Sequence, residues 1–98
     1  MRVKQSNIFS KWHRKLKDTV GKALITERIA RIEDGNFGDC FPIGGGLSEI
    51  RIHYGPGYRV YFKDTGKEII ILLCGGDKST QQSDIEKARK IAKYYKEE

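Results

Sequence analysis

Residues 47–62, which read LSEIRIHYGPGYRVYF, decide the fold of this chain. The turn signal Gly55-Pro56-Gly57 separates two segments in which polar and apolar residues alternate. Because neighbouring residues of a strand point to opposite faces, each segment has one apolar and one polar face. The apolar faces carry Ser48, Ile50, Ile52, Tyr54, Tyr58, Val60 and Phe62, and the polar faces carry Glu49, Arg51, His53, Arg59, Tyr61 and Lys63. The stretch therefore predicts an antiparallel hairpin with one mainly basic face.

The residues after this hairpin predict one more strand and a closing helix. A turn at 64–67 leads into the continuous apolar run 69–74, which is typical of a strand that is covered on both faces. We expect this strand at the centre of the sheet, with Gly75-Gly76 ending it. Ser79 or Thr80 then caps a helix whose buried stripe is Ile85, Ala88, Ile91, Ala92 and Tyr95.

The residues before the hairpin predict two helices. From Asn7, apolar residues recur at three- and four-residue steps, which favours a helix that ends near Lys17. Asp18 or Thr19 caps a second helix that stops at Gly35, and residues 1–5 are a candidate edge strand. This order of elements predicts an α+β fold, in which an antiparallel sheet packs against an N-terminal helical hairpin and is followed by a C-terminal helix.

Composition limits the classes of protein and partner. A length of 98 residues fits a single domain over 1–98. The net charge of +6 favours a polyanionic partner, with nucleic acid ahead of an acidic protein. The sequence shows no membrane-spanning run and no signal peptide, so we expect a cytoplasmic protein. Cys40 and Cys74 lie in no CxxC motif or His cluster, and we expect no metal and no cofactor.

The polar face of the hairpin is the main candidate site. Its exposed members would be Arg51, His53, Arg59, Tyr61 and Lys63. Arginine forks match phosphate oxygens and aromatic rings stack on bases, so this composition suits single-stranded RNA. The alternative is an ordinary solvated sheet face, which the spacing alone favours.

Three further segments attract attention for their glycines or their charge. Residues 75–80 (GGDKST) lie between a strand and a helix, where an anion can bind, although an ordinary turn fits equally well. We interpret Gly44-Gly45-Gly46 as a turn or flexible loop without a ligand. The basic face of the first helix, formed by Lys11, Arg14, Lys15 and Lys17, fits solvated surface, with ribosomal RNA phosphates as the alternative.

A set of motifs runs along almost the whole chain in a fixed order. They are Phe9, Trp12, Arg28-Ile29, 35–39 (GNFGD), 44–46 (GGG), 49–52 (EIRI), 55–62 (GPGYRVYF) and 74–81 (CGGDKSTQ). In this order they resemble the addiction-module killer proteins of the RelE/ParE toxin superfamily, in the branch related to HigB and to phage Gp49-like proteins. The departures are a short first strand and His13, where an apolar residue is commoner.

The resemblance implies the RelE-like fold and the activity of a ribosome-dependent mRNA endonuclease, an mRNA interferase of a type II toxin–antitoxin system. It implies as partners the ribosome, its messenger RNA and a cognate helix-turn-helix antitoxin, which would form a hetero-oligomer with the toxin. Matched position by position, the catalytic residues would be Arg51, Arg59 and Lys78. The RNA-binding residues would be His53, Tyr61 and Lys63 of the same hairpin.

The implied reaction is metal-independent attack of a ribose 2′-OH on the adjacent phosphorus, with guanidinium groups stabilising the charge that develops. Lys78 and His53 are both open as the general base. One rival function is that of a ParE-like gyrase inhibitor without nuclease activity. Another is an inert RNA-binding or antitoxin-docking module.

Overall fold

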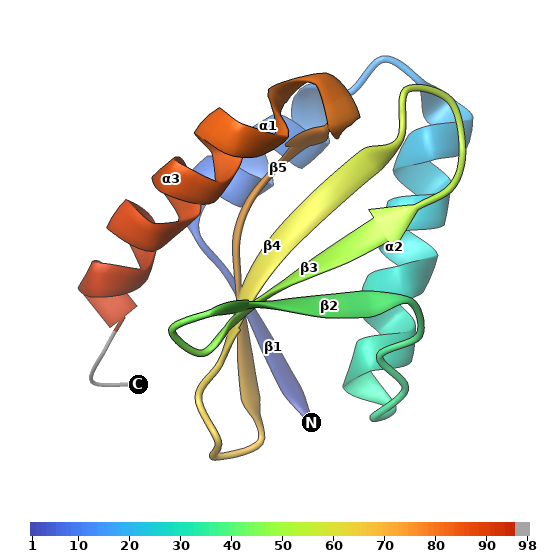
Figure 1. Cartoon of the computed structure of the whole chain (residues 1–98). Coiled ribbons are helices and arrows are strands. Elements are labelled where there is room, and N and C mark those ends of the chain that lie inside the picture. Colours follow the sequence, from blue (N-terminus) through green and yellow to red (C-terminus); the bar gives the residue numbers. More distant parts are fainter. Residues whose placement is uncertain (96–98) are drawn as a thin grey trace.

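A computed structural model describes residues 1–95, which form a five-stranded sheet with helices on both faces (Figure 1). The strand order is β1-β5-β4-β3-β2. In chain order the elements are β1 (Arg2–Gln5), α1 (Asn7–Lys15), α2 (Thr19–Glu33), β2 (Cys40–Gly44), β3 (Leu47–Ile52), β4 (Tyr58–Asp64), β5 (Ile69–Asp77), the 3₁₀ turn η1 (Lys78–Thr80), α3 (Gln81–Ala92) and the 3₁₀ turn η2 (Lys93–Tyr95).

The predicted helical hairpin is confirmed. The Ser6 hydroxyl caps α1 by accepting a hydrogen bond from the Phe9 amide at 3.0 Å. This helix ends at Lys15 rather than Lys17, because Leu16 already has extended backbone angles. Of the two candidate caps for α2, Asp18 is the one used, and its side chain accepts from the Gly21 amide at 3.0 Å.

The predicted β3–β4 hairpin is also confirmed, and the register places Arg51 directly opposite Arg59. The expected place of β5 is wrong, because β4 is the central strand and β5 lies one position from the β1 edge. β1 pairs with β5 in parallel, so the sheet is mixed rather than wholly antiparallel. The strand β2 was not predicted and forms the other edge.

Figure 1 shows α2 and α3 on opposite sides of the sheet, and each side has its own hydrophobic core. Ile70 and Leu72 of β5 face the core built with α1 and α2, whereas Ile71 and Leu73 face the core under α3. The expectation that β5 is covered on both faces is therefore correct. The helix α3 covers part of the hairpin face that we expected to be open.

Gly75 and Gly76 do not end β5, which continues to Asp77. A Cβ at Gly75 would lie 2.3 Å from the Trp12 ring, and one at Gly76 would lie 1.8 Å from the Asp84 carboxylate. Because these contacts come from α1 and α3, the two glycines let a helix approach the strand on each face.

The turn after β5 begins with a capping box. The Asp77 side chain accepts from the Ser79 amide at 2.8 Å, and the Thr80 hydroxyl accepts from the Asp77 amide at 3.2 Å. Thr80 occupies the predicted N-cap position of α3, but its side chain makes no capping bond there. This turn sets the direction in which α3 leaves the sheet.

Candidate functional site

A buried carboxylate lies where β3, β4 and α3 meet. Glu49 is 1% exposed and accepts hydrogen bonds from Arg51 Nε at 2.7 Å, Arg59 Nη1 at 3.0 Å and Gln81 Nε2 at 2.7 Å. We call these four residues the Glu49 group. Glu49 and Arg51 lie two positions apart on β3. Arg59 comes from β4, and Gln81 is the first residue of α3.

The surroundings of Glu49 keep it ionised. Burial raises the pKa of this carboxyl, but hydrogen bonds from Arg51 and Gln81, the nearby Tyr61 hydroxyl and the charge of Arg59 together lower it below its ordinary value. Glu49 therefore carries its negative charge at neutral pH. Two guanidinium charges against this carboxylate leave the Glu49 group with one net positive charge.

The predicted catalytic cations differ in their access to solvent. The Arg51 side chain is 35% exposed, and its guanidinium lies 4.3 Å from the centre of the Phe41 ring. Arg59 lies deeper, with a side chain that is 10% exposed. Lys78 is exposed and begins η1, directly after Asp77, which pairs with Tyr58 at the start of β4. All three cations thus come from adjoining ends of neighbouring strands.

The predicted open face with five side chains is wrong. The Tyr61 ring is fully buried in the core under α3, because α3 packs on this part of the hairpin. Lys63 lies toward the other end of the hairpin, opposite Leu47, and donates to the Tyr95 carbonyl at 3.2 Å. His53 is exposed beyond the end of β3 and pairs with Asp39. The structure brings together Arg51 and Arg59 but separates them from Lys63.

Arg28 connects α2 to the β3 end of this site. Its guanidinium donates to the Arg51 carbonyl at 2.9 Å, to the Phe37 carbonyl at 3.1 Å and to the Asp39 carbonyl at 3.0 Å. These bonds hold residues 37–39 against β3, which places Asp39 beside His53. The Arg28-Ile29 motif therefore supports the edge of the candidate site.

Sequence reasoning missed the roles of Glu49 and Gln81. One signal for Glu49 was available, because Arg51 and Arg59 oppose each other across two strands and such like charges need a carboxylate between them. Gln81 belongs to the 74–81 motif, but no signal pointed to its contact with Glu49, because that contact depends on how η1 directs α3.

The described residues 1–95 show neither a metal-binding cluster nor a membrane-spanning helix. No three His, Cys, Asp or Glu side chains in this range gather closely enough to hold a metal ion. No helix in the same range is both long and apolar enough to cross a membrane.

Comparison with known proteins places the chain in a family. Residues 9–96 match the family described as phage derived protein Gp49-like (DUF891). The chain belongs to this Gp49-like family. A Haemophilus influenzae protein is 47% identical to this Gp49-like protein over 92 residues, which is 94% of this chain and 93% of the relative.

The fold of the Gp49-like protein is RelE-like. It is similar to a chain in the crystal structure of the intact E. coli RelBE toxin–antitoxin complex, with a TM-score of 0.63 and 15% sequence identity. The similarity covers 78% of this chain and 94% of that chain. The family match confirms the resemblance to phage Gp49-like proteins, and the structural similarity confirms the predicted RelE-like fold.

Proposed function

We propose that this Gp49-like protein is the toxin of a type II toxin–antitoxin module and that it cleaves messenger RNA on the ribosome in the cytoplasm. The observation that carries this proposal is the Glu49 group, in which Arg51 and Arg59 share one buried carboxylate. Exposed Lys78 follows the neighbouring strand end. Family membership and the RelE-like fold support the same assignment.

The proposed reaction is attack of a ribose 2′-OH on the adjacent phosphorus. The new O2′–P bond gives a 2′,3′-cyclic phosphate, the P–O5′ bond breaks, and the departing oxygen takes up a proton to become a 5′-OH. Negative charge builds on the phosphate oxygens, where Arg51 and Lys78 are the accessible cations. Losing one such contact typically costs about 2.7 to 4 kcal/mol of transition-state stabilisation.

Arg59 is more deeply buried than Arg51 and Lys78 and belongs to the hydrogen-bonded group that orients Arg51. Its guanidinium is held by Glu49, which also fixes the Nε edge of Arg51. The remaining N–H groups of Arg51 are then held in one orientation toward a phosphate. The Arg51 side chain therefore loses less conformational entropy when the phosphate binds. Glu49 and Gln81 are positioning residues in this proposal.

Phe41 supplies the aromatic surface that Tyr61 cannot. Phe41 is 40% exposed on the edge strand β2, and its ring already lies against the Arg51 guanidinium. A base that stacks on this ring would place its own backbone phosphate near Arg51. We propose Phe41 as an RNA-stacking residue, while His53 and Lys63 remain proposed RNA contacts outside the Glu49 group.

Lys78 and His53 are the two candidates for the base that removes the 2′-OH proton. The substitution His53→Gln distinguishes the two candidates for the base, because glutamine is polar but cannot take up the proton. Unchanged cleavage by His53→Gln assigns the base to Lys78, whereas loss of cleavage with intact antitoxin binding assigns it to His53.

Primer extension on messages from cells that express the chain tests the nuclease. We expect cuts within translated codons, together with growth arrest that co-expression of the adjacent gene relieves. A ParE-like gyrase inhibitor would instead leave messages intact and produce gyrase-dependent DNA breaks. That result would overturn the nuclease proposal.

A further inference from the structure

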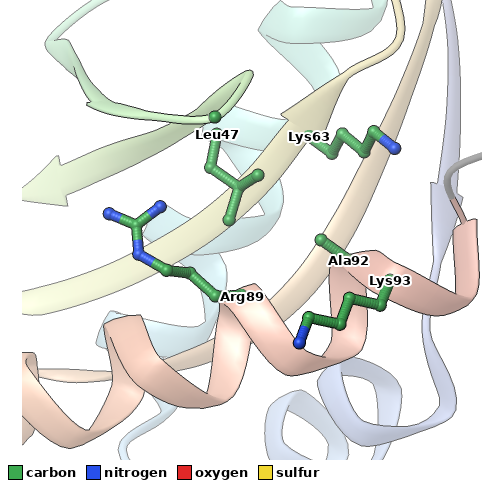
Figure 2. Close-up of a pocket in the computed structure, with 6 residues that line it drawn as sticks. Leu47, Lys63, Arg89, Ala92 and Lys93 are labelled. Atoms are coloured by element: carbon green, nitrogen blue, oxygen red, sulfur yellow. The ribbon is translucent and has the colours of Figure 1, made fainter.

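A hollow lies on the α3 side of the sheet, at the other end of the hairpin from Arg51 and Arg59. Its volume is about 270 Å³, and it is lined by Gly45, Leu47, Lys63, Arg89, Ala92 and Lys93. Figure 2 shows Leu47 and Ala92 pointing toward each other across it, with the charged ends of Arg89 and Lys63 on either side. We call it the Leu47–Ala92 pocket. Arg51 lies four positions after Leu47 on β3, so the backbones of these two residues lie about 13 Å apart at the usual strand rise.

The walls of this pocket are fixed before any partner arrives. Gly44, Gly45 and Gly46 all have positive φ angles, of 93°, 67° and 79°, which make a tight turn between β2 and β3. The Arg89 guanidinium fastens this turn by donating to the Ile43 carbonyl at 2.6 Å and the Gly44 carbonyl at 3.2 Å. The triple glycine thus has a structural role, because it makes the turn whose middle residue, Gly45, lines the pocket. A fixed pocket loses little conformational entropy on binding.

The charge around the pocket is not neutralised within the described chain. Within residues 1–95 no carboxylate forms an ion pair with Lys63, Arg89 or Lys93. Lys63 and Arg89 donate hydrogen bonds to carbonyl oxygens. These oxygens carry no formal charge, so the positive charges of the two side chains are not neutralised. The rim of the pocket therefore attracts negative charge.

The floor of the pocket decides what kind of anion fits. Leu47 and Ala92 belong to the hydrophobic core under α3, and the lining between the cations is mainly apolar. A phosphate backbone needs hydrogen-bond donors where it makes contact, and an apolar floor offers none. An apolar side chain flanked by carboxylates would bury its hydrocarbon against the floor and pair its charges with the rim.

We propose that the Leu47–Ala92 pocket docks a segment of the antitoxin that carries an apolar side chain with an acidic residue on each side. This inference rests on the proposed toxin function, since it names the surface that the partner of that toxin uses. Docking there leaves Arg51 and Lys78 uncovered by the docked segment itself. Substitutions of Ala92 or Lys93, which are not proposed RNA contacts, should therefore weaken antitoxin binding without lowering toxicity.

The dissociation constant of the purified full chain for the product of the adjacent gene tests the docking. Lys93→Glu reverses one charge of the rim, and Ala92→Met fills the floor. Lys87→Glu is the matched control, because it makes the same charge change on an exposed residue of α3 that does not line the pocket. We expect each pocket variant to bind about tenfold more weakly and the control to stay within about twofold of the wild type.

Lys93 is exposed, so we expect Lys93→Glu to fold normally. This variant therefore tests the docking even if Ala92→Met does not fold. If the wild type binds the adjacent gene product and Lys93→Glu binds it equally well, the docking proposal is overturned and the toxin function stands. If the wild type neither arrests growth nor binds that product, both proposals fail. A photo-cross-linker placed at position 93 should capture an acidic segment of the antitoxin, and capture of RNA instead would overturn the docking proposal.

Discussion

Arg59 of β4 donates to the Glu49 carboxylate of β3 at 3.0 Å, and both side chains are removed from solvent. Replacing Glu49 by Ala leaves this guanidinium buried without its counter-charge. We expect a loss of about 3 to 5 kcal/mol in the free energy of unfolding, measured by urea denaturation. The exposed pair Glu27–Arg31 gives the matched control, because Glu27→Ala should cost less than about 1 kcal/mol. Equal losses in the two variants would contradict the importance of burial.

Glu49 also predicts how stability depends on pH. Its folded-state pKa lies below the ordinary value of 4.5, so the unfolded chain binds the proton more readily. The stabilisation is fully present above about pH 4.5 and is lost as the pH falls through the folded-state pKa. Urea midpoints between pH 7 and pH 3 should therefore fall more steeply for the wild type than for Glu49→Gln. Parallel pH profiles would show that another carboxyl group dominates.

Substituting Lys78 should lower activity while leaving stability nearly unchanged. Lys78 is exposed, so Lys78→Ala should change the free energy of unfolding by less than about 0.5 kcal/mol. We expect the same variant to reduce the rate of message cleavage by about 100-fold, because one cation near the phosphate is lost. Arg59→Ala should relieve toxicity as well, and it should leave antitoxin binding intact. A Lys78→Ala chain that remains fully toxic would remove Lys78 from the site.

The contact between Gly75 and Trp12 predicts a coupled pair of substitutions. Gly75→Ala places a methyl group where the Trp12 ring now lies, and overpacking of this kind typically costs about 1 to 3 kcal/mol. Trp12→Leu removes the ring, so the double variant should be more stable than the sum of the two single losses predicts. Thermal denaturation of all four chains completes the double-mutant cycle. Additive losses would show that the cost of Gly75→Ala does not arise from contact with the Trp12 ring.

The hairpin could be predicted because its signals are local. Residues 47–62 contain both the period-two alternation and the turn residues, and the observed register keeps Arg51 opposite Arg59. The parallel pairing of β1 could not be predicted, because it depends on residues far apart in the chain. Gly75-Gly76 was misinterpreted as the end of a strand, since a glycine that breaks a strand and one that admits a neighbour look the same in sequence.

The shared face of the candidate residues on β3 and β4 could be predicted from the sequence, but their burial could not. Alternation placed Arg51, Arg59 and Tyr61 on one face, and the pairing agrees with that. Alternation cannot show how much of that face a later helix covers, and α3 buries Tyr61 while bringing Gln81 to Glu49. The side-chain contacts that orient the arginines therefore required the three-dimensional structure.

The parallel pairing of β1 with β5 also determines when the fold can be completed during synthesis of the chain. Translation produces β1 early, but its partner strand begins only at Ile69, and the Ser6 hydroxyl bonds the Leu73 carbonyl across 67 residues. Until β5 has been synthesised, Phe9 and Trp12 of α1 lack the strand against which they pack. A nascent chain therefore cannot complete the core under α1 and α2 until residues 69–77 have been synthesised, so the N-terminal helices wait for the last strand.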